Sequence, residues 1–193
     1  MIKIITPEQY NDIPWKNGKG STTELLINDD ADINDFEWRL SIAKVTENGP
    51  FSDFGGFLRN LVLINGNGIT LEHNQNSVDN LDSLLKVASF NGADTTVATL
   101  TAGPIVDFNV MTKEHMYVSN VQTYVDQHSV QLTRADICFI YCLQGVAKLS
   151  TGDSKSEYEL PAGHLMAIFD EQLQSFHLQG QDIIVVYLNS VNH

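Results

Sequence analysis

The amino-acid sequence predicts an all-β protein built from two small antiparallel β-barrels or jelly rolls. The first observation is a series of short apolar segments separated by Gly, Asn and Asp. The second is the scarcity of the 3.6-residue apolar period that marks surface helices. The third is a weak similarity between the two halves of the chain. Dense short strands joined by polar turns are typical of barrels and sandwiches.

The predicted elements begin with one short helix. Thr6 is a suitable N-cap and Pro7 suits the first helical position, so we expect a helix that ends near Tyr10. The strands that follow are apolar or alternate with period two. We expect them at residues 24–27, 37–44, 58–64, 68–72, 96–100, 108–112, 119–124, 137–143, 147–150, 165–169, 174–178 and 183–188.

Two pairs of segments support an internal repeat. They are Leu61–Gly66 (LVLING) with Ile140–Gly145 (IYCLQG), and Gly92-Ala93-Asp94 with Gly180-Gln181-Asp182. The repeat predicts an N-terminal barrel over residues 1–112 and a C-terminal barrel over residues 113–193, packed as one compact unit. We expect the N-terminal half to contribute a leading segment and a strand to the partner barrel.

The composition restricts the function classes. The chain has 193 residues, of which 42% are hydrophobic, which is enough to form a core. Its formal net charge of −13 would repel phosphate backbones, so we expect no nucleic-acid partner. A small anionic ligand remains compatible with this charge, because a few buried cations can dominate a pocket locally.

The cysteines and the apolar runs indicate a cellular compartment. Cys138 and Cys142 would lie roughly 13 Å apart on one strand, too far for a disulfide, and are predicted to be small core residues. The sequence contains no signal-peptide pattern and no apolar run long enough to span a membrane. We therefore expect a cytoplasmic protein without a membrane partner.

The histidines do not form a metal-binding pattern. Small barrels of the cupin type often hold a divalent metal with a His-x-His pair, a Glu and a later His. Here His73 precedes Asn74, and in LPAGHLMAIF, Met166 stands where the last His is expected, with His164 in the turn. We expect no metal and no cofactor, and we interpret each His as a surface or loop residue.

Two strands carry polar residues at alternate positions. In WRLSIAKV, Arg39 and Ser41 share one face, about 7 Å apart along the strand. In DFNVMT, Asp107, Asn109 and Met111 share one face. If both faces line one cavity, it suits a small polar or anionic ligand, because Arg can hold a carboxylate through two parallel hydrogen bonds.

Other interpretations of these residues stay open. The Arg39 face can simply be solvated, or Arg39 and Asp107 can form a structural pair. Arg59 can do no more than mark the start of a strand, and GPFSDFGGF can be a Gly-rich turn anchored by Phe51 and Phe54. Nothing in the sequence indicates a raised pKa for Asp107 as a general base.

Several motifs in one order resemble the HutD/Ves family. They are PWKNGKGSTTEL, FEWRLSIAKVTENGPFSDFGGFLRNLVLINGNGITL and FNGADTTVATLTAGPIVDFNVMT. The resemblance covers residues 10–112 strongly and the remainder as apolar strands. It implies a metal-free bicupin fold in a small bacterial cytoplasmic protein. It also implies a link to histidine utilisation, through binding of a pathway intermediate, or to environmental stress.

The resemblance also implies the site residues. The positions that match family motifs and form our candidate ligand site are Lys16, Asn17, Glu24, Arg39, Ser41, Arg59, Asp107, Asn109 and Met111. Trp15 is then a plug against one barrel, with Lys16 and Asn17 at a pocket rim. Gly18 and Gly20 would let the backbone approach the ligand. Lys19 and Thr23 depart from the family pattern, where Gly and Arg are frequent, so ligand choice can differ.

The sequence thus predicts a non-catalytic binder of a small anionic metabolite with a regulatory or stress role. Urocanate, formylglutamate and formiminoglutamate are candidate ligands, because all are carboxylates. The alternative is a metal-independent isomerase or hydrolase that uses Asp107 or Glu24 as base and Arg39 as anion clamp. A protein-interaction module is a third class. The oligomeric state stays open, with a homodimer among the possibilities.

Overall fold

The chain divides into two units of β-structure. The computed structural model describes residues 1–15, 20–33, 35–151, 156–169 and 173–191. One unit comprises Tyr10–Tyr117 and is called the N-terminal unit; the C-terminal unit comprises Met1–Gln9 with Val118–His193. Regular structure in the described residues consists of strands and two 3-10 turns, Pro7–Gln9 and Leu173–Ser175. The all-β prediction is confirmed.

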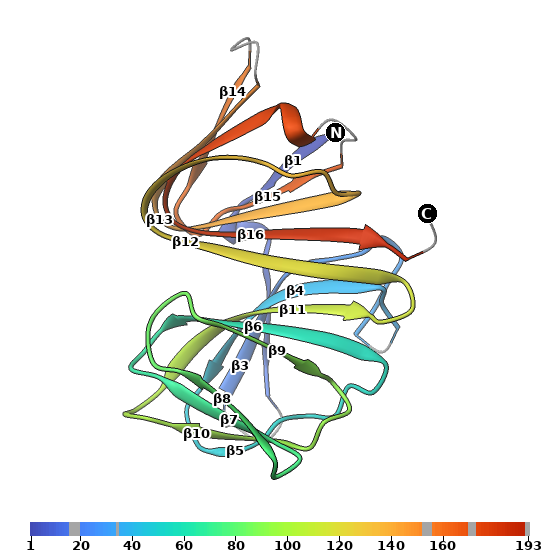
Figure 1. The fold of residues 1–193 in the computed structure, drawn as a ribbon, viewed down its shortest axis with the longest axis vertical. Helices are drawn as coiled ribbons and strands as arrows, with labels where there is room; N and C mark the ends of the chain where they lie inside the picture. The colour runs from blue at the N-terminus through green and yellow to red at the C-terminus, as the bar shows by residue number, and fades with distance from the viewer. Residues whose placement is uncertain (16–19, 34, 152–155, 170–172, 192–193) are drawn as a thin grey trace. The chain divides into compact units, whose positions relative to one another are not determined.

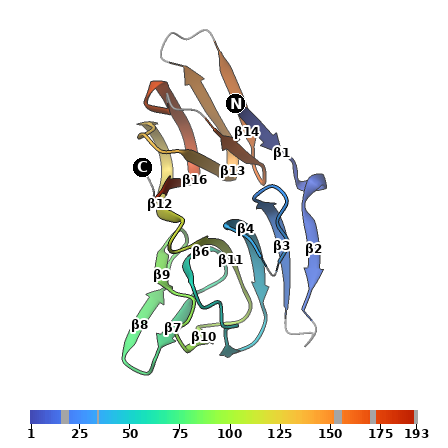
Figure 2. The same cartoon turned by 90° about the vertical axis from the view of Figure 1, so that its right-hand side faces the viewer.

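The N-terminal unit contains a six-stranded and a four-stranded antiparallel sheet (Figure 1). The six-stranded sheet has the order β2 (Asn11–Pro14), β3 (Gly20–Ile27), β4 (Trp38–Val45), β11 (Ile105–Lys113), β6 (Phe57–Asn65) and β9 (Val87–Asn91). The four-stranded sheet has the order β5 (Gly49–Pro50), β10 (Thr96–Leu100), β7 (Ile69–His73) and β8 (Ser77–Leu81). The rotated view in Figure 2 shows β7, β8 and β10 beside β6, β9 and β11.

The two sheets bury one face each against the other. Their shared core comprises Val45, Leu61, Leu63, Ala88, Phe90 and Ile105 from the six-stranded sheet and Ile69, Leu71, Leu81 and Ala98 from the four-stranded sheet. Burial of each Leu or Ile stabilises the fold by about 1.5–3 kcal/mol relative to exposure. A shift of one residue in the pairing of a strand would turn its apolar side chains away from this core, so the core fixes the register of the strands. We call these two facing surfaces the inner faces.

The C-terminal unit is built on one six-stranded sheet. Its order is β1 (Ile2–Ile5), β15 (Leu165–Ile168), β13 (Ile137–Thr151), β16 (Phe176–Ser190) and β12 (Tyr117–Gln131), with β14 (Glu157–Pro161) paired to β13. Figure 1 shows the long strands curving strongly. The register of β13 and β16 shifts between Gln144 and Lys148, and Gly145 there has a φ of 71°. Such a bulge bends a long strand and lets one sheet enclose a core.

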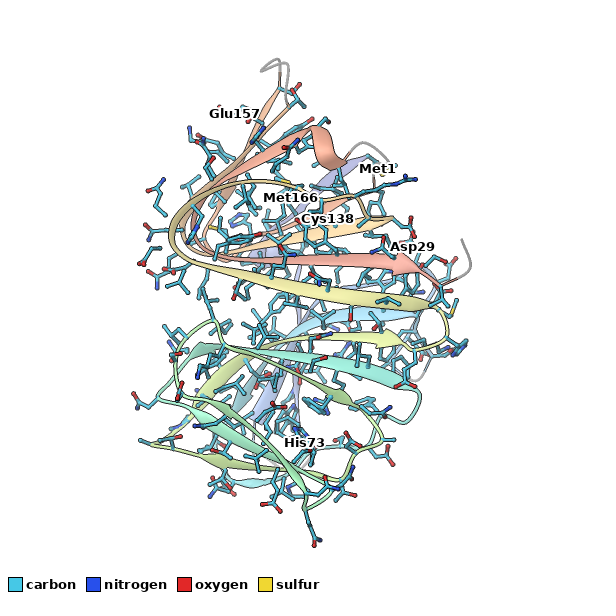
Figure 3. The ribbon with its side chains drawn as sticks, in the orientation of Figure 1. Met1, Asp29, His73, Cys138, Glu157 and Met166 are labelled. Atoms are coloured by element: carbon cyan, nitrogen blue, oxygen red, sulfur yellow. The ribbon has the colours of Figure 1, made fainter. Side chains whose placement is uncertain are left out.

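The core of the C-terminal unit is apolar. Cys138, Cys142 and Met166 all belong to it (the first and last are labelled in Figure 3), and both thiols are free. The prediction of two unpaired core cysteines is confirmed. Met166, at the position where a metal-binding His would be expected, is a packing residue that is 1% exposed.

The two units share a strand order. The run β9-β6-β11-β4 in the N-terminal unit corresponds to β15-β13-β16-β12 in the C-terminal unit. The similarity of Leu61–Gly66 to Ile140–Gly145 falls on the corresponding strands β6 and β13. The second predicted match is wrong, because Gly92–Asp94 lies in the turn that follows β9, whereas Gly180–Asp182 lies within β16.

The predicted elements agree with the observed ones in position. Every predicted strand overlaps an observed strand, although residues 137–143 and 147–150 are both parts of β13, and the predictions at 174–178 and 183–188 both fall on β16. The predicted helix is a single 3-10 turn, in which the backbone N–H of Gln9 donates to Thr6 O and that of Thr6 donates to Gln9 Oε1. No helix among the described residues is long and apolar enough to cross a membrane.

Candidate ligand site on the inner face of the N-terminal unit

Strand β11 brings two neighbouring strands into one polar surface. Asn109 lies opposite Ser41 on β4 and Leu61 on β6, and Met111 lies opposite Arg39 and Arg59. Residues directly opposite each other in an antiparallel pair project to the same face. This face also carries Leu61 of the shared core, so it is the inner face.

The predicted site residues on these strands are all buried. Those on the inner face are Arg39, Ser41, Arg59, Asp107, Asn109 and Met111, each at most 8% exposed. The interpretation of Arg39 and Ser41 as a solvated face is therefore wrong. The alternation in the sequence placed these residues together, and their role as ligand contacts stays a prediction.

Arg39 is neutralised by Glu24. Arg39 Nε donates to Glu24 Oε2 at 2.6 Å, and the two side chains are 6% and 18% exposed. Glu24 lies on β3, where the register with β4 shifts between Glu24 and Leu26. The interpretation of Arg39 and Asp107 as a structural pair is wrong, because Glu24 is the carboxylate that Arg39 contacts.

Arg59 lies among aromatic rings. Its guanidinium carbon is 5.1 Å from the ring centres of Phe51 and Phe90 and 5.4 Å from that of Phe54. Each such cation–π contact stabilises by about 0.5–2 kcal/mol. Desolvation lowers the pKa of Arg59 to about 10, and the nearby charge of Asp107 acts in the opposite direction. Arg59 therefore does more than mark the start of β6.

Asp107 and Asn109 form a buried pair beside Arg59. Asn109 Nδ2 donates to Asp107 Oδ1. Burial raises the pKa of Asp107 to about 7, although the Asn109 hydrogen bond and the Arg59 charge both lower it. A carboxyl group with this pKa changes its charge near neutral pH, which the sequence did not indicate.

This cluster has unused hydrogen-bonding capacity. Four buried side-chain polar atoms lack a partner in the described part of the chain, and three of them are Arg59 Nε, Asp107 Oδ2 and Asn109 Oδ1. Buried polar atoms in native proteins nearly always have partners, so such a concentration requires an explanation. The three atoms together offer one donor and two acceptors to a bound molecule.

His73 is a buried polar residue whose position was not predicted from the sequence. Its Nδ1 lies 2.9 Å from Thr96 Oγ1 and its Nε2 lies 3.2 Å from Asp79 Oδ2. Its ring centre is 4.6 Å from that of Phe90 (His73 is labelled in Figure 3). His73 is 3% exposed, so its interpretation as a surface or loop residue is wrong. The alternation Ile69-x-Leu71-x-His73 could have placed it on the inner face.

The described residues contain no metal-binding cluster. No group of three or more His, Cys, Asp or Glu side chains is arranged to hold a metal ion there. His73 has one carboxylate neighbour, Asp79, and the ring of His164 faces the carbonyl of Ala162 through Nδ1 at 3.1 Å.

Trp15 packs against the shared core of the N-terminal unit. Its Nε1 donates to Thr22 Oγ1 at 2.8 Å. A Cβ on Gly20 would lie 2.9 Å from the Trp15 ring and 2.3 Å from Lys44 O. Gly20 thus makes room for Trp15 and for β4. The predicted rim residues Lys16 and Asn17, with Gly18 and Lys19, lie outside the described residues.

Comparison with known proteins identifies the family. The family model described as HutD matches residues 7–186. The chain belongs to the HutD family. It is 31% identical over 127 residues to an uncharacterized 21.2 kDa protein in the hutC 3' region of Pseudomonas putida, covering 64% of each chain. It is 38% identical over 100 residues to Protein Ves of Escherichia fergusonii, covering 51% of each chain.

Solved structures show the same fold. The structure of HutD from Pseudomonas fluorescens SBW25 (formate condition) has a TM-score of 0.82 at 24% identity, covering 98% of this chain and 99% of that one. A cupin 2 conserved barrel domain protein from Leptotrichia buccalis has a TM-score of 0.52 at 11% identity, covering 92% of each chain. The HutD-family chain therefore has a cupin-like fold.

Proposed function

We propose that this HutD-family protein binds a small anionic metabolite on the inner face of its N-terminal unit. The observation that carries the proposal is the set of three buried, unpartnered atoms on Arg59, Asp107 and Asn109. A carboxylate can accept from Arg59 Nε, and an N–H group of the same molecule can donate to Asn109 Oδ1. Leu61, Leu63 and Phe90 of the same face are apolar, which suits the carbon skeleton of a small organic acid.

Urocanate, formylglutamate and formiminoglutamate are the candidate ligands. Each carries a carboxylate and a nitrogen that can donate a hydrogen bond. The resemblance to the HutD/Ves family supports a role connected with histidine utilisation, and one relative is a protein in the hutC 3' region of Pseudomonas putida. In this proposal the protein binds the ligand without converting it, and it has a regulatory or stress-response role. In this proposal Arg59, not Arg39, binds the carboxylate of the ligand, because Arg39 already forms an ion pair with Glu24.

The proposal predicts one ligand per chain. In the described part of the C-terminal unit, no buried side-chain polar atom lacks a partner. Its core is formed by apolar residues throughout. A polar ligand would have no partners there, whereas the N-terminal unit offers three atoms.

Isothermal titration tests the proposal. Purified protein is titrated with urocanate, formylglutamate, formiminoglutamate and histidine, and each mixture is assayed for product afterwards. We expect saturable binding of at least one acid, near one per chain, with the ligand recovered intact. Arg59→Met should abolish this binding, and Arg134→Gln, at an exposed arginine of the C-terminal unit, should not. Absence of binding by all four compounds would refute the proposal.

A metal-independent isomerase or hydrolase is the second candidate. It is favoured by one observation, the pKa of Asp107 of about 7, which is suitable for a general base near neutral pH. The same titration separates the two functions. Conversion of the ligand that is lost in Asp107→Asn would establish the enzyme, and recovery of unchanged ligand from the wild-type protein would exclude it for that compound.

A further inference from the structure

The charges on the inner face are paired except at one place. Among the described residues, Arg39 pairs with Glu24, and Lys113 at the end of β11 pairs with Asp35. On the four-stranded sheet, His73 lies against Asp79. In the part of the chain that the structure describes, these contacts leave Arg59 and Asp107 as the two buried acidic or basic side chains of the inner face without a direct ionic partner.

Arg59 and Asp107 influence each other without touching. Each lowers the energetic cost of the other's charge, since Arg59 lowers the pKa of Asp107 and Asp107 raises that of Arg59. Arg59 Nη1 donates a long hydrogen bond of 3.4 Å to Ser52 O, and no ion pair joins the guanidinium to the carboxylate of Asp107. In the free protein, Asp107 is therefore the distant counter-ion of Arg59.

A bound carboxylate would change this balance. Placed at Arg59, it would neutralise the guanidinium and bring a second negative charge close to Asp107. Two carboxylates in one buried site cannot both stay ionised at low cost. Asp107 Oδ2, which has no partner, is free to take a proton and to donate it toward the ligand.

We propose that a carboxylate ligand replaces Asp107 as the counter-ion of Arg59, and that Asp107 takes up one proton from solvent as the ligand binds. No covalent bond of the ligand changes. This inference rests on the proposed function and adds its regulation, because affinity then depends on pH. It makes Asp107 a neutral hydrogen-bond donor in the complex.

The direction of the pH dependence follows from the free protein. Burial already raises the pKa of Asp107 to about 7, and the ligand charge would raise it further. Below this pH Asp107 carries its proton before binding, and uptake approaches zero. Above it, one proton is taken up per ligand, and affinity falls by up to about tenfold per pH unit.

The experiment measures proton uptake directly. Formylglutamate is the preferred probe, because its carboxyl groups are ionised and its amide is neutral between pH 6 and 8.5. It is titrated calorimetrically at about pH 6 and about pH 8, in two non-carboxylate, non-phosphate buffers of different ionisation enthalpy. We expect uptake close to one proton per ligand at the higher pH and much less at the lower pH. Urocanate or formiminoglutamate replaces it if formylglutamate does not bind.

The variant Asp107→Asn separates the contribution of Asp107 to proton uptake from all other contributions. The amide mimics the neutral carboxyl, so this variant should bind with no Asp107-linked uptake and with an affinity that is nearly independent of pH. Subtracting its proton count also removes any titration of the ligand itself. Asp82→Asn, at an exposed carboxylate paired with Lys86, is the matched control and should behave as wild type.

The outcomes are distinguishable. Binding without proton uptake at the higher pH, or loss of binding in a folded Asp107→Asn protein, would overturn this inference and leave the proposed function standing. Failure of every carboxylate to bind wild type would remove both. If Asp107→Asn does not fold, difference infrared spectroscopy of the wild type decides, because a protonated carboxyl C=O band should appear on binding at the higher pH.

Discussion

Arg39 and Glu24 form a partly buried ion pair across strands β4 and β3, with Arg39 Nε 2.6 Å from Glu24 Oε2. Glu24 lies opposite Ser41, two residues from Arg39 on the same face of the sheet, so the two side chains are diagonal neighbours. Because the pair is largely shielded from solvent, removal of one partner leaves a charge with little hydration. The ion pair thus joins β3 to β4 on the inner side of the six-stranded sheet.

We expect a measurable coupling between these two residues. A double-mutant cycle with Arg39→Met and Glu24→Gln should give about 1–3 kcal/mol in the free energy of unfolding by urea. The same cycle on the exposed pair Lys148 and Glu157 should give less than about 1 kcal/mol. Equal couplings in the two cycles would show that the burial of Arg39 has no energetic consequence.

Gly20→Ala should destabilise the N-terminal unit. The added Cβ would lie 2.3 Å from Lys44 O and 2.9 Å from the Trp15 ring, so β3 or Trp15 must move at a cost of about 1–3 kcal/mol. Gly49→Ala is the control, because nothing lies within 4 Å of its Cβ position. Urea unfolding followed by tryptophan fluorescence measures both, and equal midpoints would contradict the packing of Trp15 on Gly20.

Thr96→Val tests the buried histidine. The variant keeps the shape of Thr96 and removes the hydroxyl 2.9 Å from His73 Nδ1, which leaves a buried ring nitrogen without a partner. We expect a loss of about 1–3 kcal/mol in thermal or urea unfolding. Thr99→Val, three residues along β10 with an exposed side chain, should be close to neutral. If the two substitutions had the same effect, the hydrogen bond would contribute nothing.

Asp107→Asn should alter the pH dependence of stability. The folded-state pKa is raised to about 7, so the native carboxyl keeps its proton while the unfolded chain ionises near pH 4. Stability from this group is complete below about pH 4 and is lost as pH rises toward 7. Between pH 5 and 8 the wild type should therefore lose about 2–3 kcal/mol more than Asp107→Asn in urea unfolding. Parallel curves would show that Asp107 is ionised throughout.

The strands and their faces were predictable where the side-chain pattern is strong. Alternation in WRLSIAKV and DFNVMT placed Arg39, Asp107 and Asn109 on faces that the register brings together. Six strands were missed, namely β1, β2, β5, β8, β9 and β14. They are short or rich in polar residues, so neither a period of two nor an apolar run identifies them.

The partners of the site residues could not be predicted in the same way. The contact of Arg39 with Glu24 depends on the pairing of β4 with β3, and that of His73 with Thr96 depends on the pairing of β7 with β10. Phe90 contacts both Arg59 and His73 because it lies between the two sheets. These relationships are set by tertiary packing, for which a strand's own sequence carries no signal.

The position of β1 has a consequence for the order in which the protein forms during synthesis. Met1 donates to Phe169 O at 2.7 Å across a separation of 168 residues, and β1 pairs with β15. The N-terminal unit can fold as soon as Tyr117 has left the ribosome, whereas β1, made before it, must wait unpaired for β15. Such long-range pairing closes slowly. Until then Ile2–Ile5 is an apolar strand available to chaperones.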